Sequence, residues 1–329
     1  MPNFDRRALG QQAADKLSAA HNRGKLVLLF AGVSAGLSLA SCIISMILDS
    51  QIAGTGGLGG MQLRSVLSTL QTLLELALFV FIPFWNLGYL SVALKLGRGE
   101  PADQKNLLDG FRRFGPALRL MLLRTVVSVI IGFVAMQVAS ILFAMTPWAE
   151  PFYRQVEDLN LLDISGGWDE AALKALLPAM IVYWAIIAAL YVIAMIPVTY
   201  RLRMSEYRIM DEPRCGALMA MFQSNRMMKG NCVALFKLDL SFWWYYLATV
   251  LVALLCYGDI LLAMAGIALP FSGEVGYFLF YVLALGAQIL LYWRCRNQVE
   301  CTYVCAYDAL SVEPVQPAQP PQNVPWNYQ

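Results

Sequence analysis

Six long apolar runs alternate with polar segments along the chain. The runs cover residues 25–48, about 76–96, about 120–144, 179–198, a stretch that begins near Phe242, and 276–293. Each is long enough to cross a hydrocarbon core of ~30 Å as a helix, which rises ~1.5 Å per residue. Because backbone groups in lipid must pair within their own segment, the runs predict helices. We therefore expect an all-α, polytopic bundle of six transmembrane helices.

The fifth run is the least regular. It either stops near Cys256 or continues past Gly258 and Asp259 to Leu269. We favour a helix that reaches the far interface near Gly258. Residues 260–269 would then form an extension or a segment lying on the membrane surface.

Composition supports the same class. The chain has 329 residues, of which 59% are hydrophobic and 14% charged, whereas soluble domains are about 45–50% apolar and about 25% charged. One water-soluble domain of this size cannot bury so much apolar surface.

The distribution of cations predicts the orientation. Of the 24 Lys and Arg residues, 20 fall in the N-terminal segment, the loops after the second and fourth runs, and the tail. The opposite side holds only Arg64, Arg154 and Lys174, and Arg124 lies inside the third run. Short cytoplasmic loops carry an excess of Lys and Arg. We therefore expect a cell-membrane protein with both termini in the cytoplasm.

A polar segment meets an aromatic cluster at the start of the fifth run. Lys229 and Lys237 precede the sequence "FWWYY" at 242–246. Tryptophan and tyrosine concentrate at membrane interfaces, so the cluster is typical of an interfacial belt. We expect Ser241 or Asp239 to cap the fifth helix.

Amphipathic segments flank the runs. Leu9, Ala13 and Leu17 recur at helical spacing before the first run, and further stripes follow the fourth run. Basic amphipathic helices next to a membrane either lie in its surface or pack as ordinary cytoplasmic helices, and both remain open. The chain divides into a cytoplasmic amphipathic segment (1–24), a six-helix transmembrane domain (25–310) and a disordered Pro-rich cytoplasmic tail (311–329).

Two stretches of the chain resemble each other. Ile82–Pro83 is followed by Glu100–Pro101, and Ile196–Pro197 is followed at a similar spacing by Glu212–Pro213. A basic amphipathic segment comes next in both. We interpret them as a duplicated helix–loop–helix hairpin related by an axis along the membrane normal.

The segment "SNRMMKGNCVALFKLDLSFWW" at 224–244 resembles that of a known family. Its pattern is similar to bacterial integral membrane proteins grouped as domain-of-unknown-function family 975, and "GYLSVALKLGRGEPADQKNLLDGFRRF" at 88–114 resembles the first cytoplasmic loop of that family. The residues that carry the signature segment are Ser224, Lys229, Gly230, Phe236, Asp239, Ser241 and Phe242. The chain departs from the family at Leu291–Tyr292, where Pro-Tyr is usual, and its outer segment at 259–276 is longer. The resemblance implies a six-helix multi-pass protein and no particular activity.

Three polar residues within the runs are candidate functional residues: Glu75, Asn86 and Gln137. Intramembrane acids often mark proton or ion pathways. Glu75 lies 20 residues before Lys95, or ~30 Å of helix, which favours an outer-interface carboxylate. Asn86 and Gln137, like Gln288, are typical of interhelical hydrogen bonds, with ligand contact as the alternative.

Enzyme chemistry has little support. His21 is the one histidine, and we find no nucleophile motif, paired carboxylates or metal-binding motif. We expect no disulfide framework among the seven cysteines and no zinc site at Cys301 and Cys305, which share a helix face without further ligands. We therefore expect no enzyme activity, cofactor or metal, and the lack of a basic stripe with stacking aromatics argues against nucleic acid.

Two functions remain. The first is a structural or accessory protein whose basic cytoplasmic loops engage anionic lipid head groups of the bilayer or partner proteins. The second is a transporter or channel-like protein with a pathway between the duplicated hairpins. A polar cavity lined by Glu75, Asn86 or Gln137 would favour the second. The sequence does not identify a substrate, a protein partner or an oligomeric state.

Overall fold

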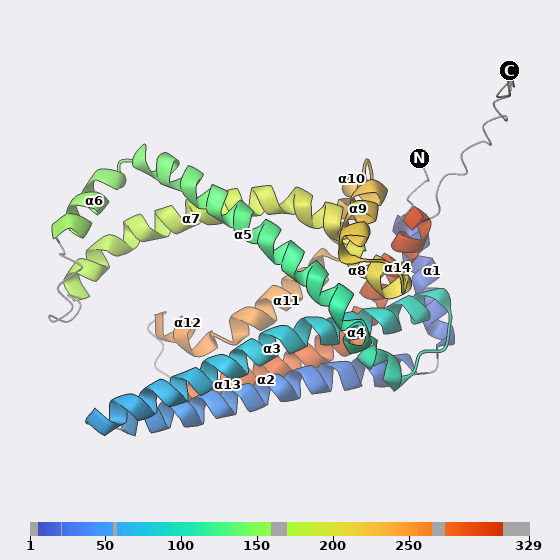
Figure 1. The fold of residues 1–329 in the computed structure, drawn as a ribbon, viewed down its shortest axis with the longest axis horizontal. Coiled ribbons are helices and arrows are strands. Elements are labelled where there is room, and N and C mark those ends of the chain that lie inside the picture. Colours follow the sequence, from blue (N-terminus) through green and yellow to red (C-terminus); the bar gives the residue numbers. More distant parts are fainter. Residues whose placement is uncertain (1–5, 21, 55–57, 159–169, 265–273, 312–329) are drawn as a thin grey trace, which may run out of the picture. The chain divides into compact units, whose positions relative to one another are not determined.

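The computed structural model describes residues 6–20, 22–54, 58–158, 170–264 and 274–311. Within these ranges the regular elements are helices and no strand is present, which confirms the all-α prediction (Figure 1). The chain divides into two compact units, Leu118–Arg203 and the remainder. The predicted tail at 311–329 lies, beyond Ser311, outside the described residues.

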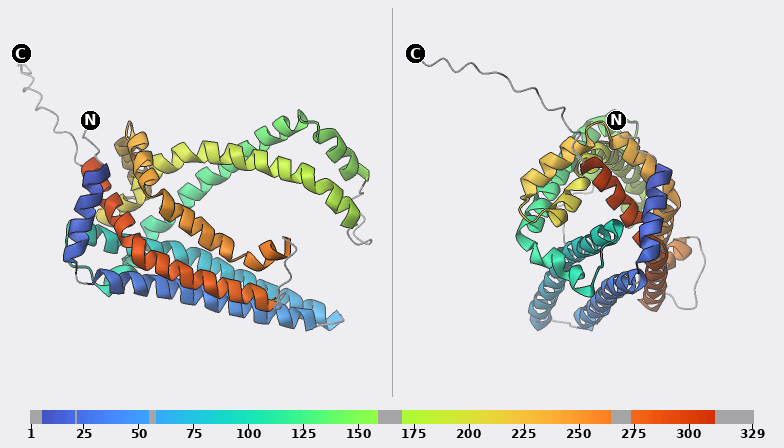
Figure 2. Two further views of the ribbon diagram at one scale, coloured as in Figure 1. Left: turned by 180° about the vertical axis from the view of Figure 1, so that it is seen from behind. Right: turned by 90° about the vertical axis from the view of Figure 1, so that its right-hand side faces the viewer.

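The first unit contains both ends of the described chain. Its elements are α1 (Arg6–Ala19), α2 (Arg23–Gly54), α3 (Leu58–Arg98), the 3-10 helix η1 (Gln104–Leu108), α4 (Asp109–Arg112), α8 (Met204–Asp211), α9 (Ala217–Met228), α10 (Cys232–Ser241), α11 (Trp243–Leu255), α12 (Gly258–Met264), α13 (Glu274–Leu291), the π-helix η2 (Tyr292–Arg296) and α14 (Asn297–Ser311). Helices α2, α3 and α13 run side by side, as both views of Figure 2 show.

The second unit comprises most of α5 (Phe114–Ala144) together with α6 (Ala149–Asp158) and α7 (Glu170–Leu202). Phe143, Ala149 and Ala179 form a small core where these helices approach one another. Two hydroxyl pairs join α5 to α7. Ser128 Oγ lies 2.6 Å from the Tyr191 hydroxyl, and Ser140 Oγ lies 3.1 Å from that of Tyr183.

Five of the described helical segments have the length and composition of membrane spans. They are Arg23–Leu48, Ser65–Arg98, Phe114–Ala144, Leu176–Asp211 and Val275–Ser311. A sixth span results if α10 and α11 are counted together, although they are bent by 66° relative to each other. The five segments overlap five of the predicted runs, and the α10–α11 pair overlaps the remaining run, which begins near Phe242. They are compatible with membrane insertion.

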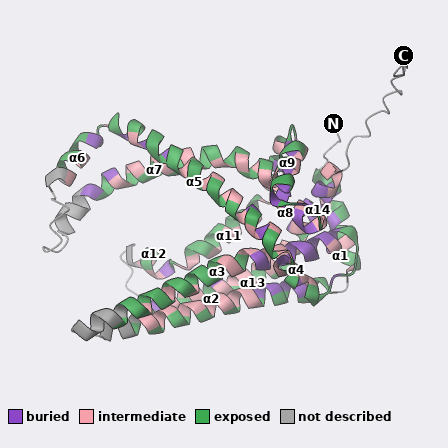
Figure 3. Ribbon diagram, in the orientation of Figure 1, coloured by how far each residue is buried: buried purple, intermediate pink, exposed green. Residues whose placement is uncertain are grey.

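The span-like helices continue well beyond the apolar runs. Helix α3 has 41 residues, or ~60 Å at ~1.5 Å per residue, about twice the thickness of a hydrocarbon core. Its C-terminal part packs against α14, α8 and η1. Figure 3 shows buried residues concentrated in α14, α8 and the C-terminal part of α3, whereas α2 and the middle of α3 expose apolar side chains.

Helix α14 is the centre of this packed end. From Cys301 to Tyr307 each of its residues is buried, and Tyr303 and Tyr307 are among the largest fully enclosed side chains. Burial of a large apolar side chain contributes about 1.5–3 kcal/mol, so this helix holds its neighbours together. Leu9, Ala13 and Leu17 of α1 are also buried, and α1 packs on α14, α3 and α10.

Two glycines allow the first loop, residues 99–113 after α3, to pack directly on that helix. A Cβ atom at Gly88 would be 1.8 Å from the carbonyl oxygen of Leu107, and one at Gly110 would be 2.0 Å from that of Phe84. Only glycine permits backbones to approach so closely. The loop, η1 and α4 therefore form a fixed part of the first unit.

The expected cap of the fifth helix is wrong. Helix α10 continues through Ser241, and Phe242 is the junction between α10 and α11. Ser241 Oγ donates a hydrogen bond to the carbonyl oxygen of Leu238 (2.6 Å), while the Asp239 carboxylate accepts one from the Tyr303 hydroxyl. Both side chains are therefore already engaged by other groups. Helix α11 ends at Leu255, before the Gly258 boundary that we favoured.

Candidate functional site

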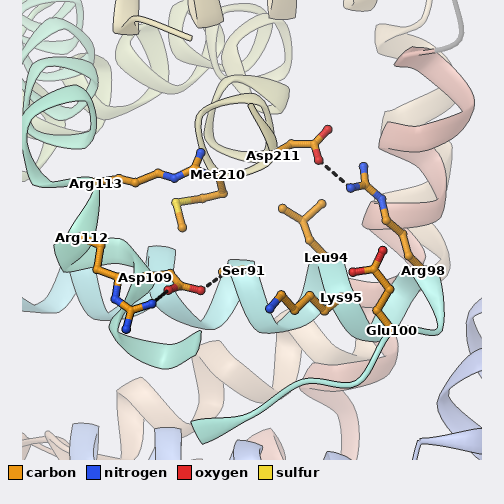
Figure 4. A pocket seen from close by; sticks show the side chains of 10 residues that line it. All are labelled: Ser91, Leu94, Lys95, Arg98, Glu100, Asp109, Arg112, Arg113, Met210 and Asp211. Carbon is orange, nitrogen blue, oxygen red and sulfur yellow. Dashed lines mark hydrogen bonds and ion pairs between the residues drawn. The ribbon is translucent and has the colours of Figure 1, made fainter. Parts of the chain in front are cut away.

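A charged pocket of about 410 Å³ lies between the C-terminal end of α3, the short helix α4 and α8 (Figure 4). Its walls carry four cations and three carboxylates. These are Lys95, Arg98, Arg112, Arg113, Glu100, Asp109 and Asp211. The pocket lies where the loops that follow the second and fourth runs meet.

Arg98 joins three helices at one wall. Its Nη1 lies 2.5 Å from Asp211 Oδ1 on α8, and its Nη2 lies 2.8 Å from Asp308 Oδ1 on α14. The Tyr307 hydroxyl donates to the other Asp211 oxygen at 3.0 Å. The planar fork of arginine is suited to engaging two carboxylates at once.

The opposite wall is also internally paired. Asp109 accepts hydrogen bonds from Ser91 Oγ (3.0 Å) and from the Asn106 amide (2.9 Å), and it pairs with Arg112 (3.0 Å). Arg113 donates to the backbone carbonyl of Ile209 on α8. Most of the charged side chains of the pocket are therefore already paired with other parts of the protein, and they are not free to bind a ligand.

Within the described part of the chain, the side chains of Lys95 and Glu100 have no hydrogen-bond or ion-pair partner. Both line the pocket in Figure 4. Their opposite charges give no strong preference for an anion or a cation. We therefore regard this pocket as a structural junction between the two loops.

A second polar site surrounds Arg296. Its guanidinium carbon lies 4.5 Å from the ring centroids of Phe30 and Tyr292 and 4.9 Å from that of Tyr89. Its Nη2 donates a hydrogen bond to Asn86 Oδ1 at 3.0 Å. The helices that supply these groups are α2, α3 and the η2 turn after α13.

A cavity of about 170 Å³ adjoins this guanidinium. Its polar lining consists of Ser34, Ser38, Asn86, Gln288 and Arg296. Gln288 Nε2 donates to the Tyr292 hydroxyl at 3.0 Å, and Ser34 Oγ donates to the carbonyl oxygen of Phe30 at 2.8 Å. The cavity thus combines a cation with several neutral hydrogen-bonding groups.

The three candidate residues of the apolar runs do not share one site. Asn86 lines the cavity beside Arg296, whereas Glu75 is exposed on α3. Gln137 is exposed on α5 and belongs to the second unit. Of the three, Asn86 is the residue that the described part of the chain places in a polar cavity.

The signature segment forms the α9–α10–α11 turn. Ser224 is fully buried on α9, and Gly230 has φ +85° in the tight turn that follows Lys229. Phe236 is exposed on α10. Asp239 belongs to a hydroxyl chain, because Tyr303 donates to it and lies 2.7 Å from the Tyr246 hydroxyl. Hydrogen bonds of Asp239 and Tyr246 with Tyr303 thus connect α10 and α11 to α14.

The cysteines show no sign of a reactive thiol. All seven are free, and the described residues contain no cluster of three or more His, Cys, Asp or Glu that could hold a metal ion. Cys215, in the loop between α8 and α9, is buried, and this burial raises the pKa of its thiol.

Sequence reasoning missed Arg98 and Arg296 as structural centres. Both were counted only as cytoplasmic charge. A signal was present for Arg296, because Gln288, Tyr292 and Arg296 are spaced four residues apart, which places them along one helix face. Arg98 has no comparable local signal, since its partners are 113 and 210 residues away.

The fold defines an all-α protein with five or six helices of membrane-span character and a packed end built around α14. The chain belongs to the family described as "Protein of unknown function (DUF975)", whose sequence model matches residues 1–293. A search of curated proteins found no match, and a search of solved structures found none either.

Proposed function

We propose that this chain is a multi-pass cell-membrane protein without enzyme activity, with both termini in the cytoplasm, whose basic cytoplasmic surface engages anionic lipid head groups. The observation that carries the proposal is the exposed apolar face of α9 and α10. We name this the α9–α10 surface. It consists of Leu218, Met219, Phe222, Val233, Phe236 and Leu240.

Helix α9 leaves large apolar side chains exposed. Ala217, Ala220, Ser224 and Met228 are buried at helical spacing, whereas Phe222 is 70% exposed. An exposed apolar face of this kind is typical of an interaction or membrane surface, and it supports contact of this face with the membrane interface.

Cations border the same surface. Arg214, Arg226, Lys229 and Lys237 are all exposed. Each cation near an anionic membrane contributes about 1 kcal/mol to binding. Trp243 and Trp244 follow at the bend into α11 and are exposed, as expected for residues at a membrane interface.

The proposal can be tested in the full-length protein reconstituted into vesicles. A bimane fluorophore at Met219→Cys should be quenched more strongly by doxyl-labelled phosphatidylglycerol than by doxyl-labelled phosphatidylcholine. In the Lys229→Gln/Lys237→Gln variant this preference should disappear. Lys105→Gln, which removes an exposed cation of η1, is the matched control and should retain it.

Equal quenching by both lipids in the unaltered protein would contradict anionic-lipid engagement. Absence of quenching by either lipid would instead favour a protein partner at the α9–α10 surface.

Transport is the second candidate, and the polar cavity beside Asn86 is the observation that favours it. In this case vesicles containing the protein should show solute or proton flux. If Glu75 relays protons, Glu75→Gln should abolish the pH dependence of that flux. Unchanged flux in this variant would remove the relay.

A further inference from the structure

Arg296 is an incompletely paired cation in an enclosed position. Its Nε atom is buried and has no hydrogen-bond partner among the described residues. Of the five N–H donors of a guanidinium, only the one directed at Asn86 has an acceptor in this part of the chain. Unsatisfied buried charge is costly, so the site favours an acceptor from outside.

The protein does not neutralise Arg296 directly. No carboxylate of the described residues lies within 4.0 Å of its guanidinium. Glu300, four residues later on α14, attracts the guanidinium from a distance without forming an ion pair, and it accepts a hydrogen bond from the Tyr207 hydroxyl at 3.1 Å. The faces of Phe30, Tyr89 and Tyr292 contribute cation–π attraction, but aromatic rings do not accept the N–H groups at the edge of the fork.

The cavity next to Arg296 has room for a ligand. Its volume of about 170 Å³ far exceeds the ~10–15 Å³ needed for one water molecule. The amide of Gln288 and the hydroxyls of Ser34 and Ser38 line it beside the guanidinium. The Ser34 hydroxyl already donates to Phe30, but the second amide N–H of Gln288 and the remaining guanidinium N–H groups have no acceptor among the described residues. These donors are suited to a tetrahedral oxyanion, which an arginine fork binds through two oxygens.

The remaining lining is apolar and lies on helices with the composition of membrane spans. Phe30 and Ile82 are two of these apolar lining residues, and the Ile82 side chain is exposed on α3. In the topology proposed above, Arg296 lies at the cytoplasmic end of its span. Basic pockets between helices at this depth are suited to phospholipid head groups.

We propose that Arg296, Asn86 and Gln288, at the junction of α2, α3 and η2, form a binding site for one organic phosphate group. The phosphate monoanion of an inner-leaflet phospholipid fits the surroundings, and a soluble phosphate ester shares the same chemistry. Arg296 is the anchor, and Asn86 positions it. The site shares no residue with the α9–α10 surface.

The test measures thermal unfolding of the full-length protein in detergent with three added ligands. Phosphatidylglycerol should raise the Tm in a saturable manner, whereas diacylglycerol with the same acyl chains should not. Soluble glycerol 3-phosphate separates the two sources, because stabilisation by it as well would assign the site to the phosphate group alone. Stabilisation by none of the phosphates would overturn the proposal.

Two variants locate the effect. Arg296→Met should weaken the apparent affinity for phosphatidylglycerol at least about tenfold, as expected when a charge-assisted hydrogen-bond pair is lost. Arg294→Met is the matched control, because it removes an exposed cation from the same turn and should leave the affinity unchanged. Equal effects of the two substitutions would refute the site.

A third variant covers the case in which Arg296→Met does not fold. Ser34→Leu retains the cation and fills the cavity, at the cost of a hydrogen bond within its own helix. It should also abolish the stabilisation by phosphatidylglycerol. Retained stabilisation in this variant would place the lipid elsewhere. Both Ser34→Leu and Arg296→Met should leave the lipid preference at Met219 unchanged, so this site and the α9–α10 surface can fail independently.

Discussion

Arg98 and Asp211 are the last residues of α3 and α8, and their side chains form an ion pair of 2.5 Å. Each precedes a Glu-Pro corner, at Glu100–Pro101 and Glu212–Pro213. A cation is favourable at a helix C-terminus and a carboxylate is not. The pair therefore satisfies the dipole of α3 directly and offsets the unfavourable charge at the end of α8.

Loss of the Arg98 fork should destabilise the first unit. Arg98→Gln removes the ties to both Asp211 and Asp308, and hydrogen bonds to charged groups contribute about 1.5–3 kcal/mol each. Because the Arg98 side chain is 32% exposed, solvent screening reduces this, and we expect a total loss of about 1–3 kcal/mol. Denaturant unfolding in detergent measures it. Arg112→Gln, at an exposed pair, should cost less than about 1 kcal/mol, and equal losses would contradict the assignment.

The close approach of the first loop to α3 can be tested at Gly88. Alanine there would place a methyl group 1.8 Å from the carbonyl oxygen of Leu107, so the loop must move away. Overpacking of this kind costs about 1–3 kcal/mol or more. The loop should then become sensitive to proteases, which gel electrophoresis after limited digestion would detect. Gly115→Ala meets no atom within 4 Å and should remain as resistant as the unaltered protein.

The turn between α9 and α10 depends on a left-handed residue. Gly230 has φ +85°, a conformation that costs a residue with a side chain about 1–2 kcal/mol. Gly230→Ala should lower the free energy of unfolding by this amount. Gly216→Ala is the comparison, because Gly216 has φ −80° and open space around it. A larger loss at Gly216 would argue against this turn geometry.

The Cys215 thiol should alkylate at higher pH than an exposed cysteine. Burial raises its pKa, so the reactive thiolate forms at higher pH than for an ordinary cysteine. Mass spectrometry of peptides after maleimide treatment, between pH 7 and pH 10, would follow its modification. Asn225→Cys provides an exposed reference thiol in the same region and should react at neutral pH. Reaction of both thiols at the same pH would show that Cys215 is accessible.

Sided labelling tests the orientation. Cysteines introduced at Asp103 and Asn225 should react with a membrane-impermeant reagent only after the cytoplasmic face is opened. A cysteine at Arg154 should react from outside intact cells. Reaction of either cytoplasmic position from outside would overturn the topology derived from the Lys and Arg distribution.

The helices were predictable because a span leaves a local signal. A run of apolar residues identifies it without knowledge of its neighbours, and the runs at 25–48 and 120–144 lie within α2 and α5. The residues at which the helices begin and end were less predictable. Helix α3 begins 18 residues before the expected run at 76, since residues such as Arg64 and Gln71 interrupt the apolar pattern without interrupting the helix.

Most of the contacts that form the two polar sites could not be predicted from the sequence. The partners of Arg98 and Arg296 depend on how helices rotate and pack, which no single stretch encodes. Asn86 could be selected as an unusual polar residue, but its contact with Arg296 spans 210 residues. Ser241 matched a capping pattern for the fifth helix, yet it is the last residue of α10, and its hydroxyl donates to the Leu238 carbonyl oxygen within that helix.

Helices α13 and α14 follow each other through η2 without a break in helical structure, from Glu274 to Ser311. The helical backbone therefore runs unbroken from Gln288, beside the Arg296 cavity, to Asp308, which holds Arg98. Helices bend at π-turns, and Figure 2 shows α14 leaving the line of α13 at η2. A change of angle at η2 would move Asp308 and with it the ion pairs that close the pocket at the end of α3.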